Sequence, residues 1–159
     1  MTEDARFEDG GEAPLRLMAA DAEDLQVLST LVQDAIFPAT EITWQKSQRR
    51  FAILLNRFRW EDKTAAERRG RRYERVQSVL LIEDALKVQS QGVNPKDADT
   101  VLSVLSLSFE AGEDGTGRVI LTLAGDGAIG VEVECLNIIL KDVTRPYTAP
   151  SGHAPEHSD

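Results

Sequence analysis

The sequence predicts an α+β fold: a strongly bent antiparallel sheet, or a small barrel, of about seven strands with one main amphipathic helix. Most apolar residues alternate with polar ones, which is typical of strands with one buried face, whereas residues 21–36 show helical spacing. Connections between the predicted strands are mostly short, so neighbouring strands should pair antiparallel. Such a sheet must curl, or pack against the helix, to bury its apolar face.

The chain divides into one predicted domain and two tails. With 159 residues it is long enough to bury a core as a single domain, for which we predict residues 15–147. Residues 1–14 are acidic and end at a proline, and residues 148–159 are rich in proline and small polar residues. We expect both of these segments to be flexible tails.

The first two predicted elements are a short strand, LRLMAA at 15–20, and the helix. Asp21 is placed to cap the helix, and Glu23 and Asp24 put negative charge in its first turn. Pro38 follows the helix and is incompatible with its continuation. The apolar side chains of the helix follow its periodicity at Leu25, Leu28, Val32 and Ala35.

The middle of the chain is predicted as strands from its alternation. Residues 42–45 form one strand and residues 51–55 begin the next. We expect a β-bulge near Asn56 to shift the phase, so that Phe58 and Trp60 point into the core. One long strand is then predicted from position 73 onward, with inward side chains at Val76, Leu80, Ile82, Leu86 and Val88.

The C-terminal half continues the strand pattern. Alternation predicts strands at 105–109, 119–123 and 129–135, and a last one that ends near position 143. Asp126-Gly127 is typical of a tight hairpin turn. Because Cys135 shares the parity of the apolar residues before it, we expect its thiol to be buried and inert.

The residue types that carry most enzyme chemistry are scarce. The two histidines, His153 and His157, lie in the predicted tail, and Cys135 is the single cysteine. Glu132 and Glu134 share one strand face about 7 Å apart, and a solvated outer face accounts for them. We therefore predict no catalytic residue, no metal site and no cofactor.

The start of the chain is acidic and has no apolar stretch, so it does not resemble a secretory signal. No apolar run approaches the roughly 20 residues that a membrane helix needs. The net charge of −9 disfavours non-specific attachment to anionic membranes or nucleic acid. We expect a cytoplasmic protein without membrane contact.

The arginines are concentrated in one part of this acidic chain. Residues 49–75 hold ten Lys or Arg against four acidic residues, a net charge of +6, which leaves −15 on the rest of a chain whose total is −9. This asymmetry is the most informative feature of the sequence for function.

Strand parity predicts where the cluster points. The expected phase shift turns Arg57 and Arg59 toward solvent, and the parity of the following strand does the same for Tyr73 and Arg75. The two strands flank one polar excursion, so they should pair and share an outer surface that suits carboxylates or phosphates. The predicted binding surface comprises Arg57, Arg59, Arg68, Arg69, Arg71, Arg72, Tyr73 and Arg75.

Three interpretations of this cluster remain open. The arginines could pair with carboxylates of the same chain, contact an acidic protein partner, or bind RNA, DNA or a phosphorylated small molecule. Nucleic acid is disfavoured, because the overall acidity opposes the long-range attraction on which such binding depends.

Five stretches in this order resemble a domain-of-unknown-function family, the one numbered 2948, of alphaproteobacteria: LRLMAADAEDLQVLSTLVQDAI, RRFAILLNRFRWE, YERVQSV, VLSVLSLSFE and GAIGVEVECL. The resemblance covers roughly residues 15–145. It implies a small cytoplasmic protein and brings with it no activity and no functional residue.

We therefore expect a non-enzymatic binding or adaptor protein that uses the arginine-rich hairpin surface to contact an acidic protein partner. The alternative is an enzyme or small-ligand-binding protein with its site in the mouth of the bent sheet, or a weak RNA or phosphate binder. The sequence leaves the oligomeric state open.

Overall fold

The computed structural model describes residues 14–94, 96–148 and 154–155. The predicted tails, including His153 and His157, fall almost wholly outside these residues. The described elements are β1 (Arg16–Ala19), α2 (Ala22–Val32), β2 (Ile36–Pro38), η2 (Ala39–Glu41), β3 (Ile42–Gln45), η3 (Lys46–Gln48), β4 (Arg50–Phe58), η4 (Trp60–Asp62), α3 (Lys63–Arg69), β5 (Glu74–Ile82), β6 (Ala85–Gln91), β7 (Val101–Ala111), β8 (Gly117–Leu123), β9 (Ala128–Val133), β10 (Ile138–Asp142) and β11 (Tyr147–Thr148).

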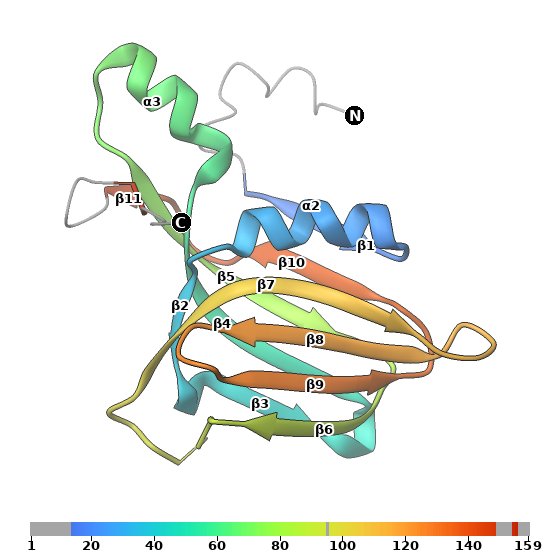
Figure 1. Cartoon of the computed structure of the whole chain (residues 1–159). Helices are drawn as coiled ribbons and strands as arrows, with labels where there is room; N and C mark the ends of the chain where they lie inside the picture. Colours follow the sequence, from blue (N-terminus) through green and yellow to red (C-terminus); the bar gives the residue numbers. More distant parts are fainter. Residues whose placement is uncertain (1–13, 95, 149–153, 156–159) are drawn as a thin grey trace.

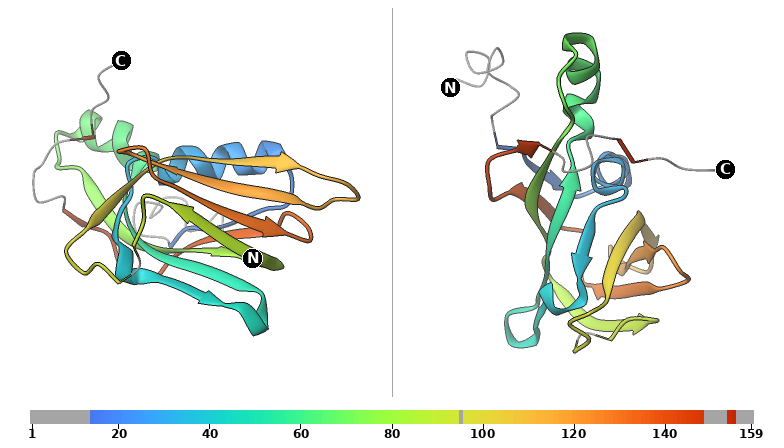
Figure 2. Two further views of the ribbon diagram at one scale, coloured as in Figure 1. Left: turned by 60° about the horizontal axis from the view of Figure 1, so that its bottom comes forward. Right: turned by 90° about the vertical axis from the view of Figure 1, so that its left-hand side faces the viewer.

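The strands form one antiparallel sheet in the order β1-β10-β5-β4-β2-β7-β8-β9-β6, with β3 beside β4 and β11 beside β5. Short β2 joins a first half, from β1 to β4, to a second half, from β7 to β6. The two halves face each other (Figures 1 and 2). In the described part of the chain β1 and β6 do not pair, so the sheet is open and not a barrel.

The α+β class is confirmed, but the predicted number of about seven strands was wrong, since the described residues form eleven. One cause is a turn within the predicted long strand. Asp84 adopts a positive φ of 55° there, and β5 and β6 fall in opposite halves of the sheet. The turn also resets the parity, so that Ala85 is buried while Leu86 is 41% exposed.

Helix α2 packs on the core between the two halves (Figure 2). Its predicted cap is confirmed, because the Asp21 carboxylate accepts a hydrogen bond from the Asp24 backbone N–H at 2.8 Å. Leu25, Leu28 and Val32 are buried against strand residues from both halves. The apolar core therefore lies inside the fold of the sheet, between its two halves.

The pairing of β4 with β5, which the sequence predicted, is confirmed, but the bulge near Asn56 was wrong. The register is continuous from Phe51 opposite Ile82 to Phe58 opposite Arg75. Every second side chain of β4 therefore points to the same face without interruption, and the Arg57 side chain points inward like that of Leu55.

The prediction that Cys135 is buried was also wrong. Strand β9 ends at Val133, so the alternation does not reach the cysteine, which is exposed. Its thiol donates a hydrogen bond to an Asp84 carboxylate oxygen at 3.2 Å. This hydrogen bond and the negative charge of Asp84 raise the pKa of the thiol, and so reduce its thiolate fraction.

Candidate functional site

The arginine-rich segment forms an arm that projects beyond the sheet (Figure 1). We define the arm as residues 57–76: the end of β4, η4, α3 and the start of β5. Helix α3 ends at Arg69 and is capped by Gly70, whose φ of 66° is the left-handed conformation that glycine adopts without strain. The arm thus consists of η4 and α3, followed by a short loop that leads into β5.

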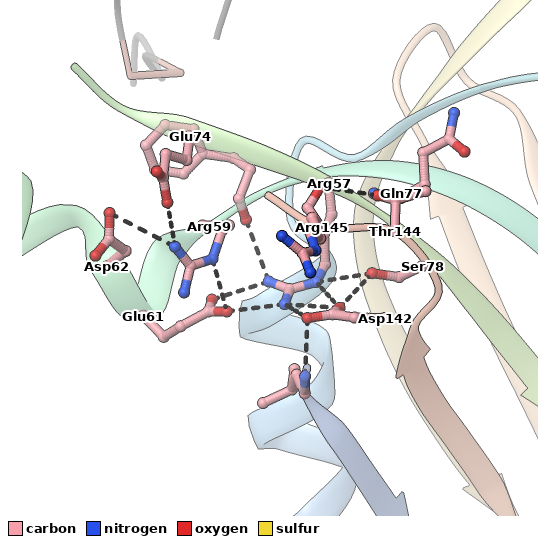
Figure 3. Close-up of polar contacts among 12 residues, drawn as sticks. Arg57, Arg59, Glu61, Asp62, Glu74, Gln77, Ser78, Asp142, Thr144 and Arg145 are labelled. Atoms are coloured by element: carbon pink, nitrogen blue, oxygen red, sulfur yellow. Dashed lines mark hydrogen bonds and ion pairs between the residues drawn. The ribbon is translucent and has the colours of Figure 1, made fainter. Parts of the chain in front are cut away.

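Arg57 lies inside the protein at the base of the arm, with no exposed surface. Its guanidinium donates two hydrogen bonds to Glu61, at 2.9 and 2.8 Å, and contacts both carboxylate oxygens of Asp142, at 3.0 and 3.2 Å. Its Nε donates to the hydroxyl of Ser78 at 3.1 Å. Figure 3 shows the guanidinium enclosed by these three residues, from β5, β10 and the arm itself.

Asp142 joins this network to Leu15, the residue that precedes β1. One of its carboxylate oxygens accepts a hydrogen bond from the backbone N–H of Leu15 at 2.9 Å. The other accepts from Ser78 at 2.7 Å as well as from Arg57. The buried charges are therefore paired and hydrogen-bonded, which is the condition for keeping an ion pair inside a protein.

Arg59 is 3% exposed and occupies a second buried position on the arm. It forms an ion pair with Glu74, and its guanidinium lies 3.7 Å from Glu61 and 3.8 Å from Asp62. Arg71 binds Asp62 through two hydrogen bonds, at 2.9 and 2.8 Å. The arm's own carboxylates therefore engage three of the predicted binding arginines.

The pKa shifts of Arg57, Glu61 and Asp62 all favour the charged forms of these groups. Burial alone would lower the pKa of Arg57, but its hydrogen bonds to Glu61 and the nearby carboxylates outweigh burial and raise it. Burial alone would raise the pKa of Glu61, but the hydrogen bonds and charge of Arg57 lower it. The hydrogen bonds from Arg71 lower the pKa of Asp62. The network suits fixed charge pairing better than proton transfer.

The prediction that Arg57, Arg59, Tyr73 and Arg75 share an outer surface was wrong. Arg57 and Arg59 are buried, and Arg75 faces the side of the sheet opposite to Arg57, because Arg75 is paired with Phe58. Arg75 is half-buried and donates to the side-chain and backbone oxygens of Asn56 at 2.6 and 3.0 Å. Tyr73 donates its hydroxyl to Glu67 at 2.6 Å.

Three predicted site residues remain available to a partner: Arg68, Arg69 and Arg72 are exposed. Within the described part of the chain, none of them forms an ion pair or a side-chain hydrogen bond, although the charge of Arg69 contributes to lowering the pKa of Asp62. They lie at the end of α3 and in the loop that follows it. We call these three residues the arm-tip arginines.

A pocket of about 620 Å³ borders the buried network. Its lining includes Glu74, Asp142, Thr144 and Arg145. Both carboxylates are engaged by Arg59 and Arg57, so the pocket offers the exposed guanidinium of Arg145 as its uncommitted charge. The described residues contain no group of three His, Cys, Asp or Glu side chains that could hold a metal ion.

Sequence reasoning missed the residues that surround Arg57. Asp142 is the polar member of an inward series that includes Ile138 and Leu140, and Ser78 precedes Leu80 in a similar series on β5. A polar residue at an inward position of each neighbouring strand was the available signal for a buried polar cluster.

The geometry defines an α+β protein with an open, folded-over antiparallel sheet and an arm anchored by buried arginines. The chain belongs to the family described as a protein of unknown function (DUF2948), whose model matches residues 15–157. No curated protein and no solved structure matches the chain. Across the described residues, no helix combines the length and apolar character needed to span a membrane.

Proposed function

We propose that this protein is a non-enzymatic binding or adaptor protein that contacts an acidic segment of a partner protein through Arg68, Arg69 and Arg72. One observation carries the proposal: three exposed arginines within five positions have no carboxylate partner among the described residues of an acidic chain. Guanidinium groups bind carboxylates through paired hydrogen bonds, which suits an acidic peptide.

The inner arginines support this role by fixing the arm. Arg57 and Arg59 connect the base of the arm to β10 and β5 through paired charges with Asp142 and Glu74. A fixed arm presents the arm-tip arginines with less loss of conformational freedom on binding than a flexible loop would. Arg57 and Arg59 thus have a structural role, and the arm-tip arginines contact the partner.

The small-ligand alternative has weaker support. The carboxylates of the 620 Å³ pocket are committed to Arg57 and Arg59, and Arg145 is a single exposed cation at its edge. A nucleic-acid role also has weaker support, because the arm-tip arginines lie on a chain with a net charge of −9.

The test is retention of partner proteins from a cell lysate, with and without nuclease, by the wild-type protein and by R68E/R69E/R72E. We expect retained partners to resist nuclease and to be lost from the variant. Fluorescently labelled poly-glutamate provides a defined probe, and its affinity should fall at least about tenfold, since three charge contacts of about 0.5–1 kcal/mol each are removed.

A charge-matched variant separates local recognition from net charge. Lys46, Lys96 and Arg145 are exposed and lie outside the arm, so K46E/K96E/R145E changes the net charge by the same amount. This control should retain the partners. Equal loss in both variants, or nuclease-sensitive retention with tighter binding of single-stranded RNA than of poly-glutamate, would contradict an acidic protein partner.

A further inference from the structure

Three central strands of the first half carry apolar residues on both faces. Their sequences contain the continuous apolar runs AILL (52–55), VLLI (79–82) and IIL (138–140). Such runs are typical of strands whose two faces are both buried, whereas a solvated outer face gives alternation. In each run the residues that point toward the second half form part of the core. The remaining residues of each run point to the opposite face of the sheet.

The strand register places these remaining residues side by side. Met18 on β1 pairs with Ile139, which pairs with Leu81, which pairs with Ala52 on β4. In the neighbouring row, Val79 pairs with Leu54. None of these side chains is buried, and Met18 is 52% exposed. They form what we call the outer face, on the side of the first half turned away from β7, β8 and β9 (Figure 2).

The outer face also has a defined order of charges. The row that contains Val79 and Leu54 begins with Arg16 on β1, followed by its partner Lys141 on β10. Beyond Leu54 the row reaches Glu41, which precedes the Ile42–Ile53 pair and lines a shallow pocket with Leu54. The row is therefore basic at one end, apolar in the middle and acidic at the other end.

We propose that the outer face is the interface of a homodimer in which two copies pack back to back. The two-fold axis lies in the plane between the two copies and runs parallel to β5. Rotation about it reverses the order of strands in the second copy, so each row of one copy lies opposite the same row of the other. Arg16 of one copy then lies opposite Glu41 of the other, and Val79 lies opposite its own equivalent. Leu81 also lies opposite its own equivalent, and Ile139 lies opposite Ala52. The methylene stem of Lys141 covers Leu54, and the ends of the row are complementary in charge.

A second copy explains both features of the outer face. Burial of the apolar rows removes them from water and accounts for the two-sided apolar strands. The reversed charge order makes the surface complementary to itself, which an unrelated partner would not require. The arm-tip arginines lie outside this surface, so the dimer does not depend on the proposed function.

The test is the molar mass of the full chain in solution, by light scattering on size exclusion, from micromolar to near-millimolar concentration. We expect a dimer for the wild-type protein. V79E puts two carboxylates opposite each other on the axis, and should give a monomer with unchanged circular dichroism. L105E is the matched control, because Leu105 is 41% exposed on β7 in the second half, and it should stay dimeric.

The charge order has its own test, which remains informative if V79E does not fold. R16E should weaken dimerisation, and R16E/E41R should restore it by exchanging the two charges. A wild-type protein that is monomeric throughout, a V79E variant that is folded and dimeric, or a double variant weaker than R16E alone would each overturn the proposal. A monomeric wild type would leave the outer face to a different occupant.

Discussion

Replacing Arg57 by alanine is expected to lower the free energy of unfolding by about 3–5 kcal/mol, the cost of removing one partner from a buried ion pair. Asp142 has a side chain only 3% exposed and would remain in the interior without its guanidinium. Glu61 would lose two hydrogen bonds, and Ser78 would lose one. The loss is therefore chiefly the cost of uncompensated buried charge.

Urea unfolding followed by circular dichroism measures this effect. Arg68→Ala is the matched control, because Arg68 lies on the same arm but is exposed, and it should change stability by no more than about 0.5 kcal/mol. If Arg57→Ala were as stable as the wild type, Arg57 could not be the residue that anchors the arm.

Replacing Phe58 by alanine is the second large effect that we expect, at about 3–5 kcal/mol. Phe58 is fully buried, but it lies on the opposite side of β4 from Arg57 and outside the main core. Its ring is 4.6 Å from the ring of Trp60 and 5.6 Å from that of Tyr73, between ring centres. This small aromatic cluster holds the base of the arm on the face that the ion pairs do not reach.

Thermal and urea unfolding test whether the cluster is part of the cooperative fold. Strands β4 and β5 run from the arm into the core, so Phe58→Ala should lower the midpoint of global unfolding. Phe109→Ala removes the same side chain from a partly buried position on β7 and should cost less. An unchanged midpoint, with faster hydrogen exchange confined to the arm, would show that the arm unfolds independently.

The features predicted correctly depend on residues close together in the sequence. The helix cap at Asp21 and the pairing of β4 with β5 follow from local periodicity and a short connection. The alternation at Phe51, Ile53 and Leu55 also continues to position 57. The inward orientation of Arg57 was therefore available from parity, but the apolar side chains of Phe58 and Trp60 argued for a phase shift instead.

Arg57 can occupy an inward position because Glu61 and the buried carboxylate of Asp142, 85 residues away, supply opposite charges. No local pattern indicates Asp142 as a partner, since its position depends on the placement of β10 beside β5. The prediction that Arg57 and Arg59 face solvent was wrong, whereas Arg68, Arg69 and Arg72 are exposed. The apolar runs of β4, β5 and β10 were an available signal of strands with two apolar faces, which the prediction of one polar face per strand overlooked.

The division of the arginines into an inner structural set and an outer binding set is tested most directly by the free energies of unfolding of Arg59→Ala and Arg72→Ala. Arg59 is 3% exposed among three carboxylates, whereas Arg72 is exposed. We predict a loss of at least about 2 kcal/mol for Arg59→Ala and less than about 0.5 kcal/mol for Arg72→Ala. Equal effects of the two substitutions would contradict the division.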